Sequence, residues 1–195
     1  MITCHLGNGS SIAAVKDGKC VDTSMGLTPL EGMIMGTRCG AIDPAIVVRL
    51  TELGYTPAEV NNIMNKKSGF LGISGISSDC RDLCAAADAG NERAQLALKM
   101  FEYEILKYIG SYAAAMGGLD AVIFTGGIGE NASEVREAVC ADMDFFGIKI
   151  DNELNATIHG KLTKLSTPDS KVEVWVVPTN EELLIARDTL ALISK

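Results

Sequence analysis

AVIFTGGIGEN, residues 121–131, joins an apolar run to a cluster of glycines. The run Ala121–Thr125 predicts a strand that is buried on both faces, because it lacks the alternation of a half-exposed strand. The glycines lead into a helix, which Asn131 and Glu134 are spaced to open as a capping pair. A strand that passes through a glycine turn into a helix is the basic unit of an α/β fold.

The segments around this unit predict further strands and helices. Between Asn91 and Met116 apolar residues recur with helical spacing, and Gly117-Gly118 end the pattern, so we expect the longest helix here. A meander of three short strands, with Asp17-Gly18 as a hairpin turn, is predicted at the start of the chain. These strands are Ile2–Leu6, Ser11–Lys16 and Lys19–Thr23.

Two more helices have recognisable starts, in which a capping side chain precedes proline. Asp43-Pro44 opens a helix that runs to Leu53, and Thr56-Pro57 opens one towards Lys67. A loop, a glycine- and serine-rich connector, a last strand and a final helix complete the chain: Ser24–Ile42, Ser68–Asp79, Val172–Val177 and Thr179–Ile193. We expect an α/β fold with a mixed β-sheet flanked by helices, in a single domain that spans residues 1–195.

Composition excludes some partners. The chain has 195 residues, a formal net charge of -8 and a sequence pI near 4.8. This balance argues against nucleic acid, whose binding depends on clustered Lys and Arg. No apolar stretch predicts a membrane helix and no signal peptide is visible, so we expect a cytoplasmic protein. The six cysteines are interpreted as reduced thiols, and Cys80 and Cys84 share one face if their segment is helical.

Two glycine-containing loops are candidate phosphate sites. In His5–Ser11, Gly7 and Gly9 lack the Cβ atoms that keep a phosphate from the backbone, and Asn8 adds a polar group. A plain tight turn between two strands is the alternative. In the second loop, Gly126, Gly127 and Gly129 join a strand to a helix start, where free N–H groups attract anions. The alternative there is a glycine turn without a ligand.

Charged positions add to the candidate site. Arg38 lies in a loop with little other charge, and its guanidinium suits a carboxylate or phosphoryl group; an internal ion pair with Glu31 or Asp43 is the alternative. Asp79 and Arg81 either close over a nucleotide or form a capping pair.

The acidic pair after the last strand is divided by role. Thr179 and Glu182 have capping-box spacing. Glu181 has no capping role and follows the carboxyl end of that strand, so it is the candidate ligand for Mg2+. An acid that only stabilises the first turn of the helix is the alternative.

Several short motifs resemble the acetate kinase family in order and spacing over the whole chain. They are His5–Ser11, Pro29 with Gly36-Thr37-Arg38, Phe124–Asn131 and Pro178–Glu182. That family resembles the sugar kinase, heat-shock chaperone and actin superfamily, in which a nucleotide lies between two similar domains. The resemblance implies an actin-like ATPase (ribonuclease H-like) fold, and this chain resembles the carboxy-terminal half only.

The resemblance also implies a role for each matching residue. The ATP loop would be His5, Leu6, Gly7, Asn8 and Gly9, with His5 and Asn8 near the transferred group. Arg38 would steady the charge on that group, and Pro29 would line the pocket for the acetate methyl. The adenosine side would be contacted by Asp79, Cys80 and Arg81. Adenine and ribose would be cradled by Gly127, Ile128, Gly129, Glu130 and Asn131. Glu181 would hold Mg2+.

The implied reaction is reversible phosphoryl transfer between ATP and acetate, which gives acetyl phosphate and ADP. The family's catalytic aspartate and other residues of its first domain are absent, so we expect no turnover without the missing amino-terminal domain. Propionate or butyrate kinase, or a non-catalytic nucleotide-binding and dimerisation fragment, are the alternatives. Family members resemble homodimers joined through this domain, and the long helix offers an apolar face. We expect Met1 to be an artificial start, because a domain seldom begins within a core strand.

Overall fold

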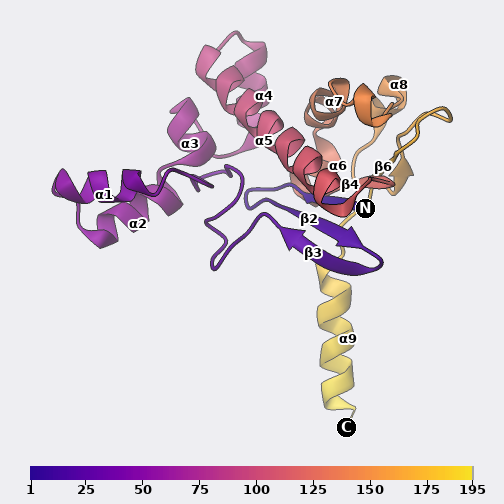
Figure 1. Cartoon of the computed structure of the whole chain (residues 1–195), viewed down its shortest axis with the longest axis horizontal. Helices are drawn as coiled ribbons and strands as arrows, with labels where there is room; N and C mark the ends of the chain where they lie inside the picture. Colours follow the sequence, from indigo (N-terminus) through magenta and orange to yellow (C-terminus); the bar gives the residue numbers. More distant parts are fainter. Residues whose placement is uncertain (195) are drawn as a thin grey trace.

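The computed structural model describes residues 1–194, apart from the side chain of Glu181. Its strands and helices are shown in Figure 1. The strands are β1 (Ile2–His5), β2 (Ser11–Lys16), β3 (Lys19–Thr23), β4 (Ala121–Thr125), β5 (Thr163–Lys164) and β6 (Glu173–Val176). The α-helices are α1 (Ala45–Glu52), α2 (Pro57–Lys66), α3 (Gly69–Ser74), α4 (Cys80–Asp88), α5 (Glu92–Met116), α6 (Gly126–Asn131), α7 (Ser133–Ala141), α8 (Asn152–Thr157) and α9 (Glu181–Ile193). A short 3-10 helix, η1, spans Asp144–Phe146.

The strands of the described residues form one mixed sheet, in the order β3-β2-β1-β4-β6-β5. β1 runs antiparallel to β2 and parallel to β4, with His5 opposite Thr125. β4 in turn runs parallel to β6. Because β1, β4 and β6 point the same way, the loops that follow them leave one edge of the sheet together. That edge is where ligands bind in open α/β sheets.

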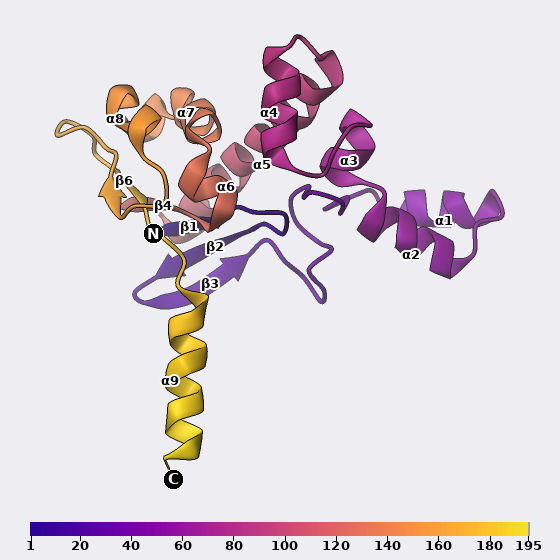
Figure 2. The same cartoon turned by 180° about the vertical axis from the view of Figure 1, so that it is seen from behind.

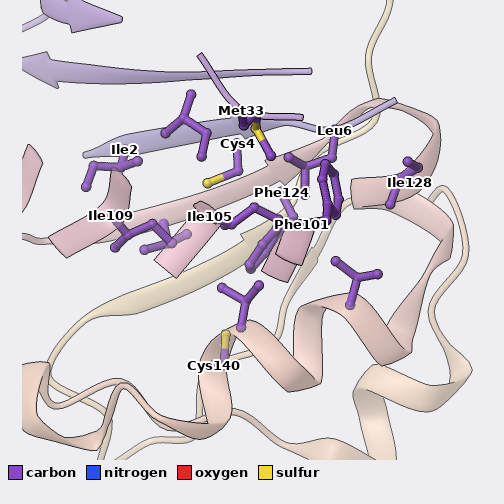
Figure 3. Packing of buried hydrophobic residues seen from close by; sticks show 14 of the residues in the cluster. Ile2, Cys4, Leu6, Met33, Phe101, Ile105, Ile109, Phe124, Ile128 and Cys140 are labelled. Carbon is purple, nitrogen blue, oxygen red and sulfur yellow. The ribbon is translucent and has the colours of Figure 1, made fainter. Parts of the chain in front are cut away.

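One face of the sheet carries the core. Alternate residues of the central strands are fully buried, among them Cys4, Phe124 and Val174, and α5 packs over them. Figure 3 shows Phe101, Ile105 and other side chains of α5 meeting those of β1 and β4. The opposite face is only half-buried, so the prediction that β4 is covered on both faces is wrong. An apolar run does not reveal which face a helix will cover.

Most of the predicted helix boundaries are confirmed. Thr56 and Glu59 form the capping box of α2 with Pro57 in its first turn. The Asn91 side chain caps α5, and Gly117 ends that helix with a φ of 76°. These signals are local, because each capping group lies within a few residues of the N–H or C=O that it satisfies.

Other boundaries differ from the prediction. The helix expected to begin at Asn131 already begins at Gly126, and the side chain of Asn131 donates to the carbonyl of Gly127 instead of capping. α7 then starts without a side-chain cap. The predicted connector Ser68–Asp79 contains α3, and η1, α8 and β5 were not predicted. These elements are short and packed against the rest of the fold, so tertiary contacts rather than sequence pattern define them.

The final helix stands apart from the body of the molecule. In both Figure 1 and Figure 2, α9 extends away from the sheet and from every other helix. Its large apolar side chains are exposed: Leu183, Leu184, Ile185, Leu190, Leu192 and Ile193. No helix in residues 1–194 is long and apolar enough to cross a membrane.

Candidate functional site

The two predicted phosphate loops are joined through the backbone of Leu6. The N–H of Leu6 donates to the carbonyl of Thr125 at 2.8 Å. The carbonyl of Leu6 accepts from the N–H groups of Ile128 and Gly129, at 2.8 and 3.2 Å. Gly126 makes this approach possible, because its φ is 78° and an added Cβ would lie 2.7 Å from the Leu6 oxygen. The first turn of α6 is therefore fixed against the end of β1.

This junction decides which N–H groups remain free. Those of Ile128 and Gly129 are bonded to Leu6, and that of Gly126 donates to Glu130 Oε1 at 3.0 Å and Thr179 Oγ1 at 3.2 Å. Of the four N–H groups that open α6, only that of Gly127 has no partner among residues 1–194. The start of α6 is thus largely satisfied by the protein itself.

The first loop keeps more donors. Ser10 Oγ accepts from the N–H of Gly7 at 3.1 Å, and its hydroxyl donates to the Gly7 carbonyl at 2.9 Å. Within the described part of the chain, the N–H groups of Asn8 and Gly9 have no partner. Successive free N–H groups in a tight loop form an anion-binding concavity. The first loop is therefore the better candidate for a phosphate site.

A cleft of about 670 Å³ lies where these loops face α4. This volume is typical of small-molecule sites. It is lined by Gly7 and Asn8 from the first loop, by Asp79, Cys80, Arg81 and Cys84 of α4 and its cap, and by Gly127, Ile128, Asn131, Ala132 and Glu134. Eight of the predicted site residues thus line one cleft, although they come from three distant segments. Cys84, Ala132 and Glu134 were not predicted, because nothing in their local pattern points to a ligand.

Asp79 and Arg81 form the capping pair that was the alternative interpretation, and both also line the cleft. The Asp79 carboxylate accepts from the N–H of Arg81 at 2.9 Å and from its guanidinium at 3.0 and 2.5 Å. The hydrogen bonds from Arg81 lower the pKa of Asp79 to about 2. The carboxylate therefore stays charged at the start of α4, where the helix dipole favours a negative group.

A second cavity of about 480 Å³ adjoins the first, and Gly127 borders both. Its other lining residues are His5, Gly126, Glu130, Thr179, Asn180 and Glu182. Glu130 Oε1 accepts from the N–H of Thr179 at 2.9 Å as well as from that of Gly126. This carboxylate therefore ties the loop after β6 to the start of α6.

The predicted capping box between Thr179 and Glu182 does not form. Asn180 caps α9 instead, because its Oδ1 accepts from the N–H of Leu183 at 3.1 Å. Thr179 Oγ1 pairs with Thr125 Oγ1 at 2.6 Å. Glu182 is thus released from capping and lines the second cavity. The side chain of Glu181 lies outside the described residues, so its predicted magnesium role stays a prediction.

Arg38 lies beside the first loop. One of its guanidinium nitrogens, Nη1, is 3.2 Å from Met35 Sδ and 3.4 Å from the carbonyl oxygen of Pro29, and it lies 3.3 Å from where a Cβ of Gly9 would be. No carboxylate of the described residues forms an ion pair with it, so the alternative of a pair with Glu31 or Asp43 is not formed. The half-buried guanidinium is available to an anion held by the first loop.

The loop that carries Arg38 is itself tied to the first loop. The N–H of Gly36 donates to the carbonyl of Asn8 at 3.1 Å. A Cβ at Gly36 would lie 2.9 Å from the carbonyl oxygen of Ser78 and 3.2 Å from Asn8 Oδ1, so glycine permits this contact. Arg38, Pro29 and Gly9 therefore form a cluster next to Asn8 and hence next to the cleft.

The described residues contain no cluster of three or more His, Cys, Asp or Glu side chains that would hold a metal ion by themselves. Mg2+ is commonly bound by one or two carboxylates together with substrate phosphates and water. Glu182, at the second cavity, is a carboxylate in a suitable place for such shared coordination.

Arg136 is a supporting residue that the sequence interpretation missed. It is fully buried on α7, and its Nη1 donates to the carbonyl of Gly129 at 3.0 Å. Its remaining donors bond Asn155 Oδ1 at 2.7 Å and the carbonyls of Asn155 and Ile158, each at 3.1 Å. A signal was present, because Arg136 shares the buried face of α7 with Val135, Val139 and Cys140. An arginine on an apolar face indicates a buried hydrogen-bond network.

Comparisons with known proteins agree with this geometry. A family model described as the acetokinase family matches residues 1–187. An acetate kinase of Clostridium novyi (strain NT) is 61% identical over 196 residues, which cover 100% of this chain and 49% of that protein. The crystal structure of Porphyromonas gingivalis acetate kinase matches with a TM-score of 0.94 at 53% identity, over 98% of this chain and 48% of its own.

A propionate kinase from Francisella tularensis subsp. tularensis SCHU S4 matches with a TM-score of 0.89 at 44% identity, over 96% of this chain and 48% of its own. The chain thus spans about half the length of the relatives it matches. The predicted α/β class, with the mixed sheet of an actin-like ATPase, is confirmed. With a family model that covers nearly all of its residues, the chain belongs to the acetokinase family.

Proposed function

We propose that this chain is the carboxy-terminal, nucleotide-binding half of an acetate kinase. The proposed reaction is reversible phosphoryl transfer between ATP and acetate, which gives acetyl phosphate and ADP. One observation carries the proposal: Asn8, Asp79 and Gly127, from three segments far apart in the chain, line one cleft at the edge of the sheet. We propose a single domain over residues 1–195.

The geometry supports a division of the cleft. Asp79, Cys80 and Arg81 on one wall and Gly127 to Asn131 on the other hold adenosine, with Glu130 fixing the second wall by its bond to Thr179. The free N–H groups of Asn8 and Gly9 receive phosphate oxygens, and His5 and Leu6 set the direction of that loop. Phosphoryl transfer depends on such positioning and on charge stabilisation.

Arg38 has the position to stabilise charge on the transferred group, because it adjoins Gly9 and has no ion-pair partner among the described residues. Pro29 beside it supplies an apolar wall for the acyl methyl. Mg2+ is assigned to Glu181, with Glu182 beside it at the second cavity. Bound there, the ion would neutralise charge on the phosphates.

Turnover also needs the missing amino-terminal domain, which supplies the rest of the acyl pocket. The exposed apolar side chains of α9 support a further partner surface, since large contiguous apolar patches are rarely left in water.

The similarity to a propionate kinase supports propionate as a second acyl substrate. Acetate and propionate differ by one methylene group, which changes an enzyme's discrimination between two substrates by only about 1–3 kcal/mol. A cytoplasmic location and a homodimer joined through α5 complete the proposal.

Calorimetric titration of MgADP into the chain tests the nucleotide site, with Gly127→Val as the informative variant. Gly127 has no positive φ, and a Cβ there meets nothing within 4 Å, so valine fills the cleft without straining the backbone. We expect ADP affinity to fall at least about 10-fold, which corresponds to about 1.4 kcal/mol.

Gly110→Val is the matched control, since a Cβ at Gly110 on α5 also meets open space and lies outside the cleft. Equal ADP affinity in both variants contradicts the proposed site. Acetate-dependent ADP formation from ATP is expected only after the other half of the enzyme is added. Turnover by this chain alone contradicts the proposal that both halves are needed.

A further inference from the structure

Two cysteines of α4 lie side by side in the wall of the cleft. The Sγ atoms of Cys80 and Cys84 are 4.0 Å apart, and both residues line the cavity. Cys84 is half-buried, whereas Cys80 is 4% exposed. No step of the proposed phosphoryl transfer uses either thiol. Cys80 is proposed only as part of the adenosine wall, so the reactivity of the two thiols has no assigned role.

The two thiols differ in their readiness to react. The hydrogen bond from the Cys80 thiol lowers the pKa of Cys84. The same bond, together with burial, raises the pKa of Cys80. The thiolate is the nucleophile in thiol chemistry, so the more accessible Cys84 reacts first. Cys80 then stands beside it as a resolving thiol.

The Cα separation of the two cysteines lies in the range of disulfides. Cys80 is the first residue of α4 and Cys84 lies one turn later, so their Cα atoms are about 6 Å apart along the helix. Disulfides span Cα separations of about 4.4–6.8 Å. Cβ atoms one turn apart on a helix are about 5–6 Å apart, whereas a disulfide needs about 3.5–4.5 Å. Closing the bond from the sulfur separation of 4.0 Å therefore requires the first turn of α4 to open.

We propose that Cys84 and Cys80 form a dithiol modification site that reacts with low-molecular-weight disulfides to give a reversible Cys80–Cys84 disulfide in the cleft wall. The Cys84 thiolate attacks one sulfur of the reagent disulfide and releases one reagent thiolate. Cys80 then loses its proton to that leaving group, attacks the Cys84 sulfur and releases the second reagent thiolate. Two protein thiols and one reagent disulfide become one protein disulfide and two reagent thiols.

The product has a consequence for the cleft. The disulfide holds the first turn of α4 open, and this turn follows Asp79 and carries Arg81. If ADP occupies the same cleft, it covers the Cys84 thiol and slows the reaction several-fold. This second statement rests on the proposed nucleotide site, whereas formation of the disulfide does not.

Bis(2-hydroxyethyl) disulfide is the suitable probe, because it is small and uncharged and so avoids repulsion by Glu134 in the cleft. The reduced chain is incubated with it, alkylated, denatured and digested with trypsin. Arg81 separates the two cysteines, so a Cys80–Cys84 disulfide links two peptides, residues 68–81 and 82–93. We expect this linked pair in the mass spectrum. Unlinked peptides under conditions that modify the exposed Cys20 would overturn the proposal.

Three variants test the order of the steps. Cys80→Ser is expected to leave one reagent group on Cys84, because the resolving thiol is gone. Cys84→Ser is expected to leave Cys80 unmodified, because that thiol is buried. Cys20→Ser removes the exposed thiol outside the cleft and should leave the linked peptides unchanged. The reverse pattern, with Cys80 modified in Cys84→Ser, would overturn the assigned roles.

The effect of ADP is measured separately. Binding of MgADP to the reduced chain is established by calorimetry, and the rate of linking is then compared with and without saturating ADP. Bound ADP that leaves the rate unchanged overturns the coupling alone. Absence of ADP binding overturns the proposed nucleotide site and leaves the disulfide, seen in the linked peptides, standing.

Discussion

The guanidinium of Arg136 is fully buried yet is bonded only to an amide oxygen and backbone carbonyls, not to a carboxylate. Burial lowers its pKa, although the group remains charged because arginine is protonated throughout the ordinary pH range. One of its bonds holds the carbonyl of Gly129, a buried residue of α6. Arg136 is therefore a positioning residue for the second glycine loop.

Arg136→Met should lower the free energy of unfolding by about 3–5 kcal/mol, because several buried acceptors lose their donor together. Urea unfolding followed by circular dichroism measures the loss. Arg49→Met is the matched control, since Arg49 forms an exposed ion pair with Glu52 and such pairs contribute at most about 1 kcal/mol. Equal losses in the two variants would contradict the role given to Arg136.

Glu102 on α5 makes stability depend on pH. Burial raises the pKa of its carboxyl to about 6, against a smaller lowering effect of Lys99. The folded state therefore holds this proton more tightly than the unfolded chain, whose glutamate pKa is about 4.3. The free energy of unfolding therefore falls as pH rises from about 4.3 through about 6. Above that range the whole loss of stability caused by the ionised Glu102 remains.

Glu102→Gln should remove this penalty and stabilise the protein above about pH 6, by at most about 1 kcal/mol because the carboxyl is half-exposed. Unfolding midpoints in urea between pH 4 and pH 8 give the difference curve. Glu137→Gln, at an exposed position of α7, is the control for the loss of a carboxylate. A Glu102→Gln difference curve that matches the curve of this control would refute the assignment.

At the scale of elements, the junction of β1, β4 and α6 controls the site. The short helix α6 would not persist alone, since isolated helices of this length are unstable in water. It is held by the Leu6 carbonyl, by Glu130 and by Arg136. The start of the chain and the consecutive elements β4 and α6, which are far apart in sequence, thus share one set of backbone hydrogen bonds.

Gly126→Ala should break this junction. The φ of 78° disfavours alanine by about 1–2 kcal/mol, and the added Cβ would lie 2.7 Å from the Leu6 oxygen. We expect a loss of stability of at least about 2 kcal/mol together with weaker ADP binding. Gly127→Ala, one residue later and without these contacts, should unfold within about 0.5 kcal/mol of the parent chain. Denaturant unfolding measures the free energy of unfolding of both variants. Equal values for Gly126→Ala and Gly127→Ala would indicate an ordinary turn at Gly126 and contradict the junction.

At the scale of the whole molecule, α5 has two apolar faces. One face is buried in the core and includes Phe101, Ile105 and Ile109. On the outside, Leu96, Met100 and Tyr103 recur at helical spacing and are 51%, 37% and 63% exposed. Such a stripe is typical of helices that pack against a partner. It supports the proposed homodimer through this helix.

The double variant Leu96→Glu/Tyr103→Glu should shift the chain from dimer to monomer, because two carboxylates would face their symmetry mates across an isologous contact. Sedimentation velocity over a range of concentrations measures the shift. The paired control is Val21→Glu/Phe145→Glu, which places the same charges on exposed apolar positions of β3 and η1. A monomeric parent chain, or a dimer that survives in the α5 variant, contradicts an interface at this helix.

Much of the fold was predictable because the signals were local. The capping box of Thr56 and Glu59, the Asn91 cap and the glycine end of α5 act over a few residues, and the sequence displays them. The glycine loops and Arg38 were likewise visible as candidates. Predictions were wrong where one sequence pattern fits two structures. Thr179 and Glu182 have the spacing of a capping box, but the side chain of Asn180 caps α9.

The sequence by itself determined every strand but the two-residue β5, the longest helix and the residue types that a phosphate and a nucleotide require. Only the tertiary structure decided that Asn8, Asp79 and Gly127 line one cleft, because that depends on the parallel pairing of β1 with β4 and on where α4 packs. It also decided that the Leu6 carbonyl satisfies the N–H groups of α6. A local pattern shows which hydrogen-bonding groups exist, whereas the fold determines which of them remain free for a ligand.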